Sequence, residues 1–115
     1  MNWQNIIDGR KEKFPMIRYQ RVGQVKIGKL GEAILFAKEV ANLVNTKFAP
    51  ISVQVYNELF GELNIIYWHA DYDDLATLEN VHAKLTADPE YLTLLSKASD
   101  IFVEGSLHDT LMKSA

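Results

Sequence analysis

The segment LNIIYWHADY, residues 63–72, constrains the fold most because it is apolar on both of its faces. Side chains alternate between the two faces of a β-strand. One face of this segment carries Leu63, Ile65 and Tyr67, and the other carries Ile66, Trp68 and Ala70. A strand of this composition needs cover on both sides, since neither face suits water. We therefore predict a strand that is buried on both faces.

The remaining segments complete an α+β pattern. Alternating polarity predicts three further strands, at residues 16–26, 51–56 and 101–112. Apolar residues at helical spacing predict a helix over residues 30–47 and a second one that starts at Asp73 or Asp74 and restarts at Asp88-Pro89. The order strand, helix, strand, strand, helix pair, strand is that of the ferredoxin-like βαββαβ plait. In that plait both helices cover one side of an antiparallel four-stranded sheet.

Domain organisation and partner classes follow from composition. Residues 1–15 show no clear period, so we expect an N-terminal arm there and a single domain at residues 16–115. A net charge of −3 does not indicate the basic surface that nucleic acid binding requires, and residues 63–72 lack the pattern of an RNA-recognition strand. The absence of cysteine excludes disulfides and cysteine-based metal sites. With no leader pattern and no run of about 18 apolar residues, we expect a cytoplasmic protein that does not enter membranes.

We expect the sheet face without helices to be covered at least in part, not fully exposed to solvent. We expect it to carry Arg18, Gln20, Gln54, Tyr56, Glu104 and His108, together with Val22, Phe102 and Met112 and with Trp68 or Tyr67. A face this rich in aromatic and apolar groups is typical of an interface or a ligand groove.

Four short motifs connect the chain to a known family. They are Val25-Lys26-Ile27-Gly28-Lys29-Leu30, Leu63-Asn64, Tyr72-Asp73-Asp74-Leu75 and Ala87-Asp88-Pro89-Glu90-Tyr91. With them the chain resembles the NIPSNAP-type proteins of the dimeric α/β-barrel superfamily, over roughly residues 17–112. The resemblance implies a homodimer in which two plaits pack sheet against sheet. The family's usual strand histidine falls on Trp68 and its usual tryptophan on Ala70, so no chemistry of that histidine is carried over.

Two groups of residues are candidate sites. Trp68 with Arg18, Gln54, Tyr56 and His108 would form either a ligand pocket with polar handles or the core of the dimer. His82 is expected on the packed stripe of the second helix, with Leu75, Leu78 and Leu85. There it is either a buried histidine with one partner or a ligand or general base that reaches a cavity.

No metal ion or other cofactor is predicted. His69 and Asp71 point the same way on a strand, but no third ligand accompanies them. From the candidate pocket and the resemblance, we expect a homodimer whose function is to bind a small, largely apolar molecule in or beside the barrel. The alternative is a small cofactor-free or haem-dependent monooxygenase, suggested by Trp68, His82 and His108 near one cavity. The sequence leaves open whether the chain is an enzyme.

Overall fold

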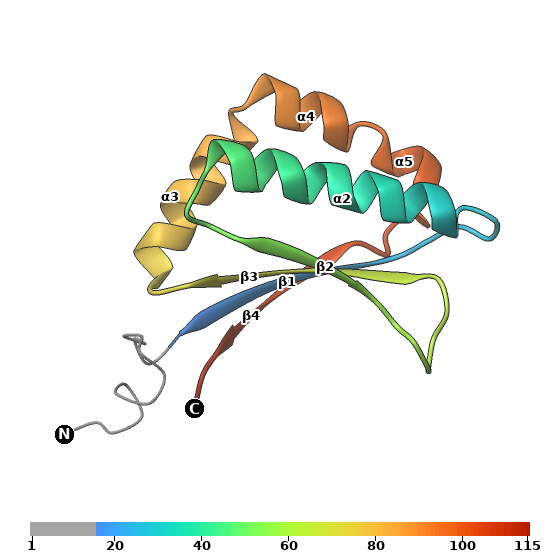
Figure 1. Ribbon diagram of the computed structural model, residues 1–115, viewed down its shortest axis with the longest axis horizontal. Helices are drawn as coiled ribbons and strands as arrows, with labels where there is room; N and C mark the ends of the chain where they lie inside the picture. Colours follow the sequence, from blue (N-terminus) through green and yellow to red (C-terminus); the bar gives the residue numbers. More distant parts are fainter. Residues whose placement is uncertain (1–15) are drawn as a thin grey trace.

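The computed structural model describes residues 16–115 as a sheet covered on one side by helices (Figure 1). The elements, in chain order, are β1 (Ile17–Gln24), α2 (Leu30–Lys47), β2 (Val53–Asn57), β3 (Ile65–Tyr72), α3 (Leu75–Thr86), α4 (Pro89–Leu95), α5 (Ala98–Ile101) and β4 (His108–Lys113). The strands lie in the order β2-β3-β1-β4, and every neighbouring pair is antiparallel. This confirms the predicted ferredoxin-like plait. The expected arm at residues 1–15 lies outside the described residues.

Side-chain caps start two of the helices where the sequence predicts them. The Asp74 carboxylate accepts a hydrogen bond of 2.8 Å from the backbone N–H of Thr77 and so caps α3. The Asp88 carboxylate accepts one of 2.9 Å from the N–H of Tyr91, and Pro89 follows it in the first turn of α4. None of the helices in residues 16–115 is long and apolar enough to cross a membrane.

The core lies between the sheet and the helices, and Trp68 is at its centre. Its ring packs edge-on against Phe36 of α2, with 6.4 Å between centroids, and lies 5.8 Å from the Phe102 ring. The indole N–H donates a 3.2 Å hydrogen bond to the carbonyl of Ala37. Trp68 is 5% exposed, so its expected place on the helix-free face is wrong. Both faces of β3 are apolar, and strand alternation alone could not tell which one the helices cover.

The fourth strand is shorter than predicted. Residues 98–101 form the short helix α5, and β4 begins only at His108. Phe102 is 2% exposed on the helix side, where its backbone bridges to Val25, so its expected place on the other face is wrong. The apolar residues at positions 101 and 103 imitate strand alternation. A turn closed by the 3.1 Å bond from the Ser106 N–H to the Val103 carbonyl, with Gly105 at φ 78°, separates them from β4.

His82 does not lie on the packed side of α3, so that expectation is wrong as well. Its side chain is exposed, whereas Val81 and Leu85 are buried. The apolar stripe therefore runs through Leu78, Val81 and Leu85. The prediction assumed that Leu75 belongs to the buried stripe, and helical spacing from Leu75 then places His82 on it. Leu75 is 46% exposed, so the assumed stripe was displaced around the helix.

Neighbouring positions on α2 test this packing. Phe36→Ala should lower the free energy of unfolding by about 3–5 kcal/mol, because it leaves a cavity beside Trp68. Leu35→Ala is the matched control: Leu35 is 65% exposed, and the change should stay within about 0.5 kcal/mol. Urea denaturation measures both, and equal losses would contradict the assigned orientation of the helix.

Candidate functional site

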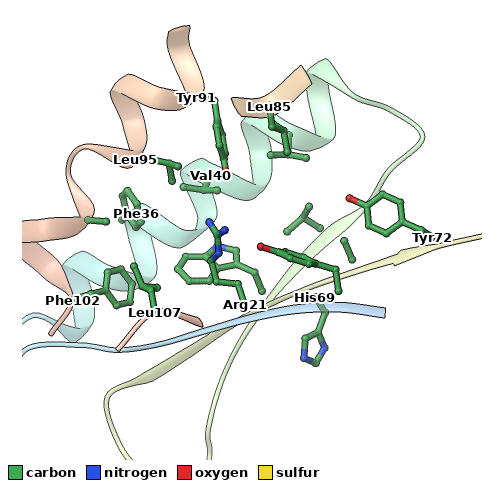
Figure 2. Close-up of a pocket in the computed structure, with 16 residues that line it drawn as sticks. Arg21, Phe36, Val40, His69, Tyr72, Leu85, Tyr91, Leu95, Phe102 and Leu107 are labelled. Atoms are coloured by element: carbon green, nitrogen blue, oxygen red, sulfur yellow. The ribbon is translucent and has the colours of Figure 1, made fainter. Parts of the chain in front are cut away.

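A cavity of about 70 Å³ lies between the sheet and the helices (Figure 2). Its walls are mostly apolar and come from β1, β2, β3 and all four helices; they include Phe36, Val40, Val44, Trp68, Leu85 and Leu95. Pockets for drug-sized ligands measure roughly 300–1,000 Å³. The cavity as it stands therefore suits only a small molecule.

Arg21 lines this cavity and belongs to a partly buried ion pair. Arg21 of β1 donates to Asp109 of β4 through Nε at 2.7 Å and through Nη2 at 3.0 Å. The two residues are directly opposite in the β1–β4 register, which sets up the two-bond geometry. The hydrogen bond to Asp109 raises the pKa of Arg21, against the opposing effect of burial. Burial raises the pKa of Asp109, but hydrogen bonds from Arg21 and Tyr19 outweigh it, and the net pKa is lowered.

Three tyrosines complete the polar part of the cavity wall. Tyr19 bonds to Asp109, and burial raises the pKa of its hydroxyl. Tyr72 and Tyr91 are 7% and 8% exposed and enter the cavity from β3 and α4 (Figure 2). Among residues 16–115, neither of these two hydroxyls has a hydrogen-bond partner. Burial also raises the pKa of Tyr72. Both hydroxyls are therefore free to bond to a molecule in the cavity.

The opposite face of the sheet, which we call the open face, holds four of the six candidate residues. The strand registers place Arg18, Gln54, Tyr56 and His108 there together. Arg18 donates to Asp71 at 2.8 and 3.0 Å, and the Tyr56 hydroxyl donates to Gln54 at 2.7 Å. The hydrogen bond from Arg18 lowers the pKa of Asp71.

His69 lies among these residues, although the sequence suggested no more than an unlikely metal ligand. Its ring is 5.0 Å from the Tyr56 ring, and its Nε2 is 2.9 Å from the Gln20 Oε1. Figure 2 shows this ring pointing away from the cavity. Burial and the nearby Arg18 charge lower the pKa of His69. Within residues 16–115 no three His, Asp or Glu side chains are arranged to hold a metal ion.

The residues behind the monooxygenase hypothesis do not surround one cavity. Trp68 lines the cavity, whereas His108 lies on the open face, where its Nδ1 is 3.1 Å from the Ser106 carbonyl. His82 does not line the cavity, but it is close enough to Asp109 to contribute to the lowered pKa of that carboxyl. The proposed arrangement of the three residues is therefore wrong.

Arg21 and Asp109 were missed by the sequence reasoning. Arg21 alternates in phase with Tyr19 of β1, which lines the cavity, and with the buried Val25 directly after that strand. A charged residue in that phase is the signal that could have been used, because buried charges need a partner. Asp109 could not be chosen as that partner until the register of β4 was known.

The chain is similar to several solved structures. A NIPSNAP-family protein of unknown function from Agrobacterium tumefaciens has a TM-score of 0.72 and 21% identity, covering 87% of this chain and 88% of its own. A dimeric protein of unknown function with a ferredoxin-like fold from Bacteroides fragilis has a TM-score of 0.64 and 13% identity, covering 85% of this chain and 95% of its own. A proposed antibiotic biosynthesis monooxygenase from Chloroflexus aurantiacus has a TM-score of 0.62 and 11% identity, covering 87% of this chain and 93% of its own. No protein-family model and no curated protein matches the chain.

These likenesses define the class of protein. The chain is an α+β protein with the ferredoxin-like fold, and that fold is shared with structures of very different names. Three further matches are NIPSNAP or NIPSNAP-like domain proteins. The resemblance to NIPSNAP-type proteins is thus confirmed at the level of the fold.

The ion pair at the cavity wall leads to a prediction about stability. Asp109→Asn should lower the free energy of unfolding by about 1 kcal/mol near neutral pH, a small value because the pair is partly exposed. The folded-state pKa of Asp109 is lowered, so its contribution is present above the unfolded-state pKa of about 3.9. It is lost as the pH falls through the folded-state pKa.

Urea denaturation of both proteins from neutral pH to below about pH 4 measures this effect. The difference between them should shrink as the solution becomes acidic. Glu104→Gln is the control, since Glu104 is exposed and has no ion pair within residues 16–115. A difference that stays constant with pH would contradict the role given to the Asp109 carboxylate.

Proposed function

We propose that this chain is a NIPSNAP-type protein that forms a homodimer through its open face and binds a small, largely apolar molecule in the cavity beside the sheet. The observation that carries the proposal is the cavity, whose mostly apolar wall contains a few polar groups. Such a wall is typical of small-molecule sites, where apolar contacts provide affinity and polar groups fix orientation. A cytoplasmic location stays a prediction from sequence.

The composition of the open face supports the homodimer. The helices all cover the other side of the sheet (Figure 1). Tyr56 and Met112 on the open face are 48% and 40% exposed. The loop between β2 and β3 bends away from the helices, and its Leu59 and Phe60 are 84% and 89% exposed (Figure 1). Exposed apolar groups on one side of a molecule favour an interface, and the similar protein from B. fragilis is described as dimeric.

A small monooxygenase-like enzyme is the second candidate. The fold likeness to the C. aurantiacus protein and the position of Trp68 in the cavity wall support it. It ranks second because His108 is on the opposite side of the sheet and cannot act in this cavity. Oxygen uptake on quinol-type substrates, or a Soret shift on addition of haem, would reverse this order.

A charged residue placed at the centre of the open face tests the homodimer. Val22 pairs with Tyr67 on one side and His108 on the other. Val22→Glu should weaken dimerisation at least tenfold, because each protomer would bury an unpaired carboxylate. Tyr56→Glu is a second probe at a more exposed position. Sedimentation velocity at micromolar concentration measures the dissociation constant.

Leu92→Glu provides the matched control for these substitutions. Leu92 lies on α4 and is 47% exposed, on the helical layer away from the open face. Its substitution should leave the dimer intact. An unsubstituted protein that sediments as a monomer would overturn the homodimer.

Filling the cavity tests the ligand site. Val40→Phe on α2 adds volume to the cavity wall and should abolish binding of a small apolar probe such as cyclopentane. The overpacking should cost about 1–3 kcal/mol of stability. Amide chemical shifts during titration report the binding. Leu35→Phe changes an exposed position on the same helix and should bind the probe as the unsubstituted protein does.

A further inference from the structure

The cavity wall offers hydrogen-bond donors that no acceptor within residues 16–115 uses, namely the hydroxyls of Tyr72 and Tyr91 and the remaining N–H groups of Arg21. We propose that the molecule bound there is a neutral carbonyl compound, such as a small ketone, whose oxygen accepts hydrogen bonds from Tyr91 and Tyr72. This inference rests on the proposed small-molecule function of the cavity and adds the chemical class of its ligand. It depends on three features of the wall, which are the free hydroxyls, the closed ion pair and the position of Tyr91.

The first feature is the pair of unused hydroxyls. Tyr72 and Tyr91 are more than nine-tenths buried, and both line the cavity. Within residues 16–115 no side chain or backbone group bonds to either hydroxyl. No fully buried polar side-chain atom of residues 16–115 lacks a partner, so both hydroxyl oxygens stay in contact with solvent. A ligand oxygen that accepts their hydrogen bonds takes the place of that water.

The second feature is that the ion pair is closed and neutral overall. The Asp109 carboxylate already accepts hydrogen bonds from Arg21 and Tyr19. A ligand ammonium group would therefore find the charge of the Asp109 carboxylate already balanced by Arg21. A ligand carboxylate would add a negative charge beside Asp109 in an apolar cavity, which is unfavourable. Neutral ligands avoid both problems.

The third feature is the central position of Tyr91. Tyr91 lines the cavity together with Tyr19, Arg21 and Tyr72. Figure 2 shows its side chain reaching from α4 toward Arg21. The Arg21 guanidinium uses Nε and Nη2 for Asp109, and no other acceptor within residues 16–115 bonds to its remaining N–H groups. Donors from α4, β1 and β3 thus line the cavity in which the ligand oxygen would lie.

The test compares three small probes on the full chain by NMR titration: cyclopentanone, cyclopentane and butyrate. Tyr91→Phe should weaken cyclopentanone binding about 3- to 10-fold, the value of one hydrogen bond, and should leave cyclopentane binding within about twofold. Tyr72→Phe should act in the same direction and serves if the first variant does not fold. Butyrate should bind the unsubstituted protein more weakly than cyclopentanone.

Tyr67→Phe is the matched control, because the Tyr67 hydroxyl bonds to Glu58 and lies outside the cavity. It should change none of the affinities. If cyclopentane binds but cyclopentanone is insensitive to both cavity variants, or if butyrate binds more tightly, the carbonyl assignment fails while the small-molecule function stands. If neither neutral probe shifts the amides of the cavity wall, the proposed function fails with it.

Discussion

The burial of Trp68 against α2 determines which way every strand of the sheet faces. Trp68 lies opposite Arg21 on β1 and Val55 on β2, so these residues also point toward the helices. A shift of one residue in any register would turn a whole strand over and expose its apolar side chains. The hydrogen bond from the indole to Ala37 adds a directional contact to this packing. The cavity and the open face are both consequences of this one orientation.

The sequence was sufficient for the order of the four strands and the main helices and for the starts of α3 and α4, because those depend on local signals. Asp74 and Asp88 cap helices in the way that short-range chemistry requires. Which face of β3 packs against the helices could not be derived, since Ile65 and Ile66 make both of its faces apolar. Only contact with α2 separates the two faces. The shortened β4 has a similar origin, because an apolar residue every second position fits a strand and also fits the approach to a turn.

The candidate site was only partly predictable for the same reason. Arg18, Gln54 and Tyr56 were placed on the correct face because polar and apolar residues alternate clearly in β1 and β2. The cavity was missed because its polar groups come from elements that are distant in sequence. Arg21 and Asp109 are 88 residues apart, and the β1–β4 register alone brings them together. A charge in the core phase of a strand shows that a partner exists, but it does not show which residue that is.

Strand β1 belongs to both proposed sites. Tyr19 and Arg21 face the cavity, whereas Arg18, Gln20 and Val22 face the open side. Because side chains on opposite faces of a strand do not touch, a substitution on one face reaches the other only through a shift of the backbone. Strand β4 likewise carries residues of both faces. It is an edge strand, all six of its residues are exposed, and it carries Asp109. A second copy on the open face would cover His108 and Met112, whereas Asp109 points to the cavity side with Arg21. The Arg21–Asp109 pair therefore keeps its surroundings when the dimer forms, and a loss of the homodimer need not change the cavity.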